Sequence, residues 1–286
     1  MGVSPSAVTR LINELEAHVG VRLINRTTRR MVLTEAGEAY HERVRRILAE
    51  LEDADASVRS SSLSVNGLLK VLAPSAFTTS QLAPRLGEFR RRYPALTVSL
   101  SSPGLVEALD ANFDVSVIAS RGAAPDGEFV ARQLACSDVV LCAAPAYLRR
   151  FGPVERPSDL QDHEVLVTTP GEEMVLQRDG ASPHESAFRF LPRNVPLSTS
   201  HMDIVQSAVL SGFCIAPLPS YAVAQAVVDG RLVRVLPGWR LYRISLYAAM
   251  PTRKYVPAKT RAFMDYLFEA FPGGAADPWA RLVDAS

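Results

Sequence analysis

Six apolar side chains recur between residues 40 and 58 at successive steps of 4, 3, 4, 3 and 4 residues. They are Tyr40, Val44, Ile47, Leu51, Ala54 and Val58. This heptad spacing places them on one face of a helix that pairs along its length. Thr34 can cap the helix, and Glu35 and Glu38 lie near its positive end. We therefore expect a long helix over residues 35–60. Its seam is covered either by a second copy, in a homodimer or homotetramer, or by its own chain as in ordinary bundles.

The preceding segment predicts a shorter helix with two unlike faces. Ser4 suits the N-cap, Pro5 suits the first turn, and Gly20 suits the residue that ends the helix. Apolar side chains recur at helical spacing on one face, namely Val8, Leu11, Ile12, Leu15 and Val19. The other face carries Ser4, Ser6, Thr9, Arg10 and Asn13. Such side chains contact base edges and phosphates from a helix in the major groove, although a solvated polar face is the other interpretation.

An arginine-rich turn follows this helix. The pattern of residues 23–33 predicts two short strands, with Arg26, Arg29 and Arg30 at or near the turn between them. Residues 1–34 hold five Arg and two Glu, a local charge of +3 in a chain whose formal net charge is +1. Arginines at a hairpin tip suit phosphate contacts, and a solvated loop is the alternative. A helix followed by such a hairpin is typical of a winged helix-turn-helix domain, here over residues 1–34.

Strands and helices alternate after a Ser-rich connector at residues 60–67, which predicts an α/β domain over residues 66–272 with mostly parallel sheets. Expected strands include residues 96–102, 164–169 and 195–200, and a helix is expected at residues 104–113. Two lobes are favoured, lobe I at about 66–134 and 239–272 and lobe II at about 138–236. The expected crossings lie at Leu134–Asp138 and near Pro237–Trp239. The Gly- and Ala-rich segment from Gly273 is expected to be frayed.

The segment GVSPSAVTRLINELEAHVGVRLINRTTRRMVLTEAGEAY, residues 2–40, resembles the recognition helix, wing and start of the linker helix of LysR-type transcriptional regulators. Residues 202–239 are similar to a late stretch of the same family, and the resemblance between the two segments is looser. The resemblance implies a winged helix-turn-helix, a linker helix that dimerises and a two-lobed, periplasmic-binding-protein-like effector domain. It also implies two partners, double-stranded promoter DNA and a small-molecule effector bound between the lobes.

This chain departs from the family at its beginning. In the family two helices precede the stretch found here at residues 2–10, so roughly 20 residues are expected to be missing, given typical helix lengths. Either the start is misplaced or the polypeptide begins at Met1. In the second case Val8, Leu11 and Leu15 would lack the helices on which they pack, and we expect poor DNA binding. Tight, sequence-specific binding in a gel shift would refute that expectation.

Hydroxyl side chains follow several of the expected strands. In open α/β sheets, ligands bind beyond the carboxyl ends of the strands, and hydroxyl groups there suit a small carboxylate or a similar anion. In relatives the corresponding loops line the effector cleft. The resemblance therefore assigns effector binding to Ser75, Thr78, Ser102, Thr168, Ser200 and His201. The alternative is helix capping for the hydroxyls, and an ordinary surface histidine for His201.

Nothing in the sequence indicates an enzyme. The chain contains no phosphate-binding loop and no Gly-x-Ser-x-Gly elbow, and its five histidines lack metal-ligand spacing. We expect no catalytic residue, metal site or cofactor. Cys142 and Cys214 lie in apolar strands, whereas Cys136 near the first crossing is expected to be more accessible. Redox sensing through these cysteines is a minor alternative.

The composition, 48% hydrophobic and 21% charged residues, is that of a globular protein. No stretch reaches the roughly 20 uncharged apolar residues that cross a bilayer, and residues 1–10 lack the apolar core of a signal peptide. We therefore expect a cytoplasmic transcriptional regulator without a membrane partner. The alternatives are a DNA-binding-deficient effector-binding protein and a solute-binding protein of the periplasmic type. The N-terminal helix and hairpin argue against the second alternative.

Overall fold

The computed structural model describes residues 5–26, 31–59, 65–179, 187–251 and 256–284. The chain divides into two compact units, Met1–Leu63 and Ser64–Ser286, and each is described by itself. Among the described residues, no helix is both long and apolar enough to span a membrane.

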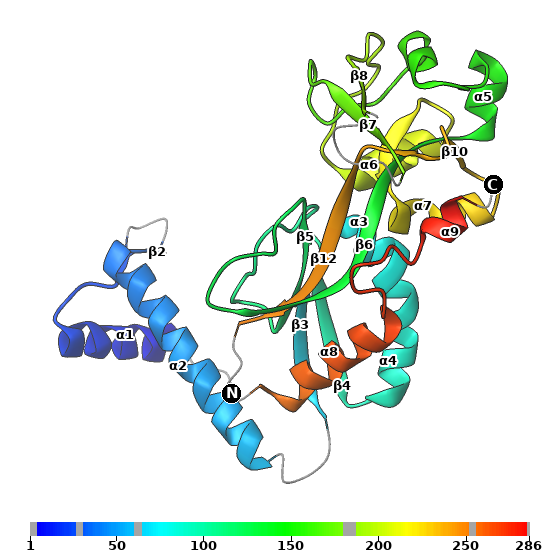
Figure 1. Cartoon of the computed structure of the whole chain (residues 1–286). Helices are drawn as coiled ribbons and strands as arrows, with labels where there is room; N and C mark the ends of the chain where they lie inside the picture. Colours follow the sequence, from blue (N-terminus) through cyan, green and yellow to red (C-terminus); the bar gives the residue numbers. More distant parts are fainter. Residues whose placement is uncertain (1–4, 27–30, 60–64, 180–186, 252–255, 285–286) are drawn as a thin grey trace. The chain divides into compact units, whose positions relative to one another are not determined.

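The first unit consists of a helix, a hairpin and a long helix (Figure 1). Its elements are α1 (Pro5–Val19), β1 (Ile24–Arg26), β2 (Met31–Leu33) and α2 (Glu35–Arg59). The two strands are antiparallel, with Ile24 opposite Leu33. The elements predicted from the sequence for this part of the chain are therefore confirmed. The hairpin tip at residues 27–30 and the connector at residues 60–64 lie outside the described residues.

Two polar side chains hold the hairpin to the helices on either side of it. The Glu16 carboxylate of α1 accepts hydrogen bonds from the backbone N–H groups of Leu23 and Ile24, each at 2.9 Å. The Thr34 hydroxyl accepts the Gly37 N–H at 2.9 Å, which confirms Thr34 as the N-cap of α2. These bonds fix where the chain leaves α1 and where it enters α2.

A seven-stranded mixed sheet forms the centre of the second unit. Its strands are β3 (Gly67–Leu72), β4 (Leu96–Ser101), β5 (Val115–Ser120), β6 (Val130–Ala143), β9 (Ala216–Pro219), β10 (Val233–Val235) and β12 (Tyr242–Met250). Their order is β10-β6-β12-β5-β3-β4, and β9 also pairs with β6. A smaller antiparallel sheet contains β11 (Trp239–Arg240), β7 (Met174–Arg178) and β8 (Ala187–Phe190).

The long strands β6 and β12 run through both lobes of this unit (Figure 1). We call lobe I the part built on β3, β4, β5 and residues 130–134 and 247–250, and lobe II the part built on residues 139–143 and β7–β11. Between the lobes the β6–β12 register shifts, because Leu246 pairs with Ala135 but Tyr247 pairs with Gln133. Leu134 is thus the extra residue of a β-bulge, and we call residues 134–138 of β6 the hinge.

Helices cover both lobes. In lobe I the elements α3 (Ser75–Phe77), the π-helix η1 (Thr78–Leu82), the 3-10 helix η2 (Ala83–Arg85) and α4 (Leu86–Arg92) follow one another without a break, and α8 is Ala258–Ala270. In lobe II the helices are α5 (Pro145–Phe151), the 3-10 helix η3 (Pro157–Asp162), α6 (Met202–Leu210) and α7 (Ser220–Val228). A short helix, α9 (Ala280–Val283), packs on α7.

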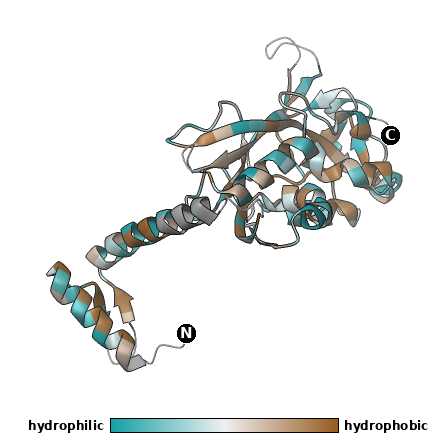
Figure 2. Ribbon diagram, turned by 90° about the horizontal axis from the view of Figure 1, so that it is seen from below, coloured by the Kyte–Doolittle hydropathy of each residue, from teal (hydrophilic) through white to brown (hydrophobic). Residues whose placement is uncertain are grey.

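The core follows the two lobes. Phe77, Phe89 and Phe263 are fully buried in lobe I, and Tyr147 and Leu160 are fully buried in lobe II. In Figure 2, brown hydrophobic segments dominate the interior strands of this unit, whereas brown and teal segments alternate along α2. Apolar burial on this scale is the main stabilising contribution to the fold.

Two expectations about secondary structure in this unit are wrong. Residues 104–113 form no helix, because the carbonyls of Gly104 and Val106 accept the N–H groups of Ser75 and Ala119 instead of helical partners. Residues 164–169 and 195–200 form only isolated bridges, such as Val167 with Ser198, and not strands. The small sheet of β7, β8 and β11 had no expected counterpart.

The expected sheet direction is also wrong. Only β3–β4 and β3–β5 pair parallel, and the other strand pairs of the described residues are antiparallel. The reason is that the chain passes from one lobe to the other within the long strands β6 and β12, and these two strands run antiparallel to each other. The first crossing lies at Leu134–Asp138 as expected, but the return lies in the first half of β12, since Trp239 still pairs with β7 of lobe II.

The segment from Gly273 is not frayed. Trp279 and Val283 are buried in the core of the second unit, and the Gly274 N–H donates to the Leu134 carbonyl at 2.8 Å. The folded domain therefore extends to residue 284, beyond the boundary expected at residue 272.

Candidate functional site

The candidate DNA-contacting face lies on α1. Thr9, Arg10 and Asn13 are exposed there. Ser6 belongs to the same helix, and its spacing from these residues puts it on the same face. The Arg10 guanidinium lies 3.5 Å from Glu14, an exposed pair of low stability that leaves the cation available to a phosphate. Of the hairpin arginines, Arg26 ends β1. The predicted residues that lie outside the described part of the chain are Ser4, Arg29 and Arg30.

The predicted seam lies along α2. Tyr40 and Val44 are half-buried, while the Ile47 side chain is 57% exposed and has the exposed Leu48 beside it. Leu51, Ala54 and Val58 belong to the same helix. Within the first unit, the apolar stripe of α2 is thus left uncovered at Ile47, because the hairpin does not reach that side chain.

Three predicted hydroxyl residues gather at one edge of lobe I. The carboxyl ends of the parallel strands β3 and β4 bring the turn at Ser75 beside Ser102. The Ser102 Oγ donates to the Thr78 Oγ1 at 2.8 Å. Ser75 and Thr78 are each 8% exposed, and Ser102 is exposed. The N-cap of the helix that begins at Ser75 is Pro74, without a side-chain bond, so the Ser75 hydroxyl is not a helix cap.

Lobe II places His201 opposite this edge. His201 is the N-cap residue of α6 but makes no side-chain cap bond. A Cβ atom on Gly104 of lobe I would lie 3.7 Å from the His201 Nδ1, and the Gly104 carbonyl accepts the Ser75 N–H at 2.9 Å. The Gly104 turn is thus bonded to Ser75 of lobe I and lies close to the His201 ring of lobe II.

The remaining predicted residues lie on lobe II. Thr168 and Ser200 are exposed, and the Ser198 Oγ donates to the Thr168 carbonyl at 3.2 Å. The hydrogen bonds of the described residues do not connect Thr168 to the hydroxyls of lobe I. Thr168 is therefore bonded within lobe II, whereas Gly104 of lobe I is bonded to Ser75 and lies close to His201.

One cation after a neighbouring strand had no expected role. Arg121 follows β5, which is parallel to β3 and continues past the end of β3, since Leu72 pairs with Ser116. Its guanidinium carbon lies 3.5 Å from the ring centroid of Tyr242, at the start of β12. Burial raises the pKa of the Tyr242 phenol, and the nearby Arg121 cation opposes that rise. The position of Arg121 directly after a strand is the signal by which it could have been found.

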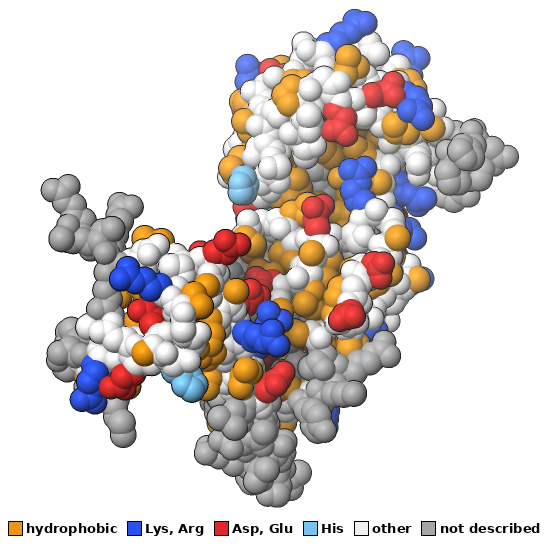
Figure 3. Space-filling model, turned by 90° about the vertical axis from the view of Figure 1, so that its left-hand side faces the viewer, with side chains coloured by type: hydrophobic (Ala, Val, Ile, Leu, Met, Phe, Trp, Pro, Cys, Tyr) orange, Lys and Arg blue, Asp and Glu red, His pale blue; other side chains and the backbone are white. Residues whose placement is uncertain are grey.

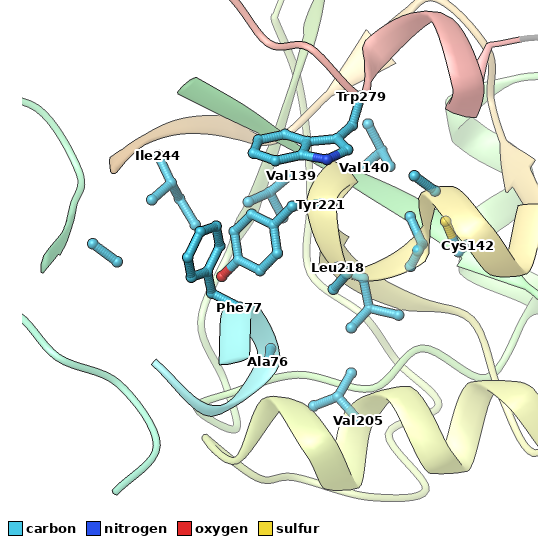
Figure 4. Packing of buried hydrophobic residues seen from close by; sticks show 14 of the residues in the cluster. Ala76, Phe77, Val139, Val140, Cys142, Val205, Leu218, Tyr221, Ile244 and Trp279 are labelled. Atoms are coloured by element: carbon cyan, nitrogen blue, oxygen red, sulfur yellow. The ribbon is translucent and has the colours of Figure 1, made fainter. Parts of the chain in front are cut away.

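Direct contacts between the lobes also had no expected counterpart. Phe77 of lobe I meets the Tyr221 ring of lobe II edge-on, with ring centroids 5.6 Å apart. Gln81 donates to the Tyr221 carbonyl at 2.6 Å and accepts the indole N–H of Trp279 at 3.0 Å. Figure 4 shows Phe77, Tyr221 and Trp279 side by side. Figure 3 shows hydrophobic side chains where the surface is indented between the lobes, with charged side chains of both signs around them.

Comparison with known proteins accounts for both units. Residues 1–38 match the family model described as bacterial regulatory helix-turn-helix protein, lysR family. Residues 63–272 match the model described as LysR substrate binding domain. This chain belongs to the LysR family of transcriptional regulators. The resemblance found in the sequence is thereby confirmed, and the helix-turn-helix match disfavours a stand-alone solute-binding protein.

Individual LysR relatives agree with the match. The HTH-type transcriptional regulator YhjC of Escherichia coli is 33% identical over 263 residues, which are 91% of this chain and 87% of YhjC. The structure of CrgA from Neisseria meningitidis is 29% identical with a TM-score of 0.62, covering 94% of this chain and 90% of CrgA. The full-length virulence activator AphB of Vibrio cholerae is 25% identical with a TM-score of 0.63, covering 93% and 90%. The two-lobed, periplasmic-binding-protein-like architecture of the effector domain is therefore that of the LysR family.

The cysteines of this LysR-type regulator are free thiols in the core. Burial raises the pKa of Cys142 to about 12 and that of Cys214 to about 11. Cys136 is buried as well, so the expectation that it is more accessible is wrong. Its Sγ accepts the Gln133 amide N–H at 3.1 Å. Such buried thiols behave as small apolar side chains.

In the described part of this LysR-type chain, no three His, Cys, Asp or Glu side chains are placed to hold a metal ion. Two surface hollows of about 440 and 410 Å³ lie on lobe II. The first is lined by α6 residues such as Asp203 and Ser207, and the second by residues around Pro145 and Arg231. Neither hollow is lined by the six predicted effector-binding residues.

Proposed function

We propose that this LysR-type regulator responds to an anionic small molecule held between its lobes. The observation that carries the proposal is that Gly104, bonded to Ser75 beside the Thr78–Ser102 pair, lies close to His201 of the other lobe. Arg121 supports an anion, because it adds a cation directly after β5, the strand that pairs parallel with β3. Hydroxyl donors and a guanidinium are the groups that bind small carboxylates.

Such a site gives the regulator a means of control. A ligand that contacts both lobes binds one lobe arrangement better than another, and only that difference in affinity shifts the equilibrium between arrangements. We propose that the shift is passed to the paired α2 helices and changes how two DNA-binding units lie on a promoter. Thr168 and Ser200, both exposed on lobe II, complete the proposed site.

Thermal shift assays test the effector site. Small mono- and dicarboxylates are screened against the full chain, and a hit at 100 times its Kd stabilises the folded state by about 2.7 kcal/mol. Thr78→Val and His201→Ala should each remove most of that stabilisation for the hit. Thr97→Val, the same substitution at an exposed position of β4, is the control and should retain it. A hit whose stabilisation survives Thr78→Val and His201→Ala would place its site elsewhere.

We propose that duplex DNA contacts the polar face of α1 and the hairpin. Thr9, Arg10 and Asn13 are exposed on one face of α1, at the spacing by which a recognition helix contacts neighbouring base pairs. Ser4, Ser6, Arg26, Arg29 and Arg30 belong to the same proposed interface.

The DNA proposal predicts different roles for different side chains. For a duplex selected by the chain from a random library, Asn13→Ala should lose about 1–3 kcal/mol of discrimination at one base pair. Arg10→Ala should weaken binding to all duplexes and reduce its salt dependence. His18→Ala, on another face of α1, should change neither quantity. Fluorescence anisotropy at several salt concentrations measures both effects, and equal behaviour of all three variants would contradict this interface.

We further propose that the chain acts as a homodimer or homotetramer in the cytoplasm, where promoter DNA is found. The exposed Ile47 and Leu48 on α2 support self-association, since two such stripes can cover each other.

A further inference from the structure

The segment from Pro272 to Asp284 connects parts of the effector domain that are otherwise far apart in the chain. It leaves α8 of lobe I after residue 270, passes along the hinge and ends on α7, where Figure 1 shows α9 beside that helix. We call residues 272–284 the clasp. Its contacts fall into three groups, at the hinge, between the lobes and on lobe II.

At the hinge the clasp bonds to the backbone of β6. The Gly274 N–H donates to the Leu134 carbonyl at 2.8 Å, and the Cys136 N–H donates to the Ala276 carbonyl at 2.9 Å. Leu134 is the bulged residue at which the β6–β12 register shifts. The clasp is therefore attached where a change in the angle between the lobes would be absorbed.

Asp277 continues this attachment into lobe II. One carboxylate oxygen accepts the Asp138 N–H at 2.8 Å and the Ser220 hydroxyl at 2.7 Å, and the other accepts the Trp279 N–H at 2.9 Å. The Ser220 Oγ is also 2.7 Å from the Ser137 Oγ. One side chain thus holds the hinge strand, the start of α7 and the clasp in a fixed relation.

Trp279 occupies the junction of the two lobes and is 5% exposed. Its indole N–H donates to Gln81 of lobe I at 3.0 Å, while its ring lies edge-on to Tyr221 of lobe II, with centroids 5.8 Å apart. Gln81 in turn donates to the Tyr221 carbonyl at 2.6 Å. Figure 4 shows the indole above Tyr221 and near Val139 of β6. Moving one lobe relative to the other would break at least one of these contacts.

The far end of the clasp is fixed on lobe II. Val283 is buried against α7, and Asp284 pairs with the buried Arg234 of β10. Arg234 also pairs with Asp179 at 3.0 Å and donates to the Trp239 carbonyl at 2.7 Å. The clasp is attached to both lobes and to the hinge. It therefore resists rotation of one lobe relative to the other, which a segment bonded to a single lobe would not do to the same extent.

We propose that the clasp sets the angle between the two lobes, with Trp279 as the wedge and Gln81 as its contact in lobe I. Packed interfaces of this kind move between discrete arrangements and do not deform continuously. Any change in lobe angle therefore requires the Trp279–Gln81–Tyr221 contacts to separate and form again. The proposal concerns the resting angle of the protein and does not depend on the identity of an effector.

Distances between spin labels on the two lobes test this proposal. Arg90→Cys on α4 and Arg149→Cys on α5 provide exposed attachment sites, whereas the native cysteines are buried. Labelled full chain is mixed with excess unlabelled chain, so that only distances within one subunit are recorded by pulsed electron paramagnetic resonance. With the clasp intact we expect one narrow distance distribution. In Trp279→Ala the distribution should at least double in width or shift its centre.

Two further variants separate the clasp from general stability. Gln81→Leu keeps the indole in place but removes both polar bridges, and it should broaden the distribution even if Trp279→Ala does not fold. Leu160→Ala removes a fully buried side chain within lobe II, and it should lower the melting temperature while leaving the distribution unchanged. If Gln81→Leu and every folded Trp279→Ala sample give the narrow distribution of the unmodified chain, the clasp does not set the lobe angle.

Discussion

Gly37 shows how much a single residue decides in the DNA-binding unit. It lies in the first turn of α2, where a Cβ atom would stand 2.0 Å from the Leu23 carbonyl oxygen. The Gly37 N–H is at the same time bonded to the Thr34 hydroxyl. The absence of a side chain thus allows α2 to approach the turn between α1 and the hairpin, and no propensity scale would favour glycine at this helical position.

Gly37→Ala should therefore destabilise the first unit. The gain in helix propensity, up to about 1 kcal/mol, is smaller than the roughly 1–3 kcal/mol cost of overpacking against backbone. Gly87→Ala is the matched control, because Gly87 is exposed in α4 and a Cβ there meets no atom within 4 Å. It should stabilise its unit by about 0.5–1 kcal/mol. Circular dichroism during urea unfolding measures both, and equal gains in the two variants would contradict the close approach seen at Leu23.

The residues of the proposed effector site were only partly predictable at this scale. That Ser75, Thr78 and Ser102 lie near one another could be expected, because the carboxyl ends of parallel strands share one edge. Arg121 follows β5 but was not selected, since the candidates were hydroxyl residues after expected strands and His201. Gly104 could not be found from the sequence, because its importance lies in the approach of His201 from the other lobe.

Among the elements, α2 shows that periodicity identifies a helix but not its partner. Tyr40 and Val44 are half-buried, and Ile47 is exposed within the unit. The heptad spacing was sufficient to predict α2 over nearly its whole length. What covers its seam depends on a second surface, which the pattern does not specify.

Ile47→Glu should weaken self-association if α2 pairs with its copy. Burying an isoleucine side chain stabilises by about 1.5–3 kcal/mol, and a symmetric dimer buries it twice, so the dissociation constant should rise about 100-fold or more. Ala49→Glu introduces the same charge on the opposite, exposed face of α2 and should leave the constant nearly unchanged. Sedimentation equilibrium measures both, and a dimer that is unaffected by Ile47→Glu would mean that another surface holds it.

The segment 104–113 shows where element prediction fails. Its apolar spacing favoured a helix, but bonds from Ser75 and Ala119 draw its carbonyls toward α3 and β5. Tertiary hydrogen bonds thus replaced the local ones that a helix would have formed.

At the scale of the whole effector domain, charged side chains connect segments that the chain order keeps apart. Arg234 on β10 pairs with Asp179 after β7 and with Asp284 of the clasp. Arg243 of β12 forms a two-pronged pair with Asp138 of the hinge, at 2.8 and 2.9 Å. These pairs lie along lobe II and the hinge, where the two crossing strands meet the clasp.

Arg234→Met should destabilise the domain by about 2–3 kcal/mol, because the buried guanidinium is the shared partner of two carboxylates and a carbonyl. The loss is expected below that for a wholly buried pair, since both carboxylates retain contact with water. Arg189→Met breaks the exposed pair with Glu173 and should cost less than about 1 kcal/mol. Chemical denaturation of the full chain compares them, and equal midpoints would show that Arg234 adds no net stability.

The local elements of the chain are determined by the order of its residues. Capping at Thr34 and apolar periodicity along α1 and α2 act between residues close in sequence, so they can be recognised without coordinates. Tertiary structure alone decided that β6 and β12 pair antiparallel across the hinge, that His201 faces Gly104, and that Trp279 is buried between the lobes. Each of these depends on contacts between residues far apart in the chain, and a linear pattern records no such pairing.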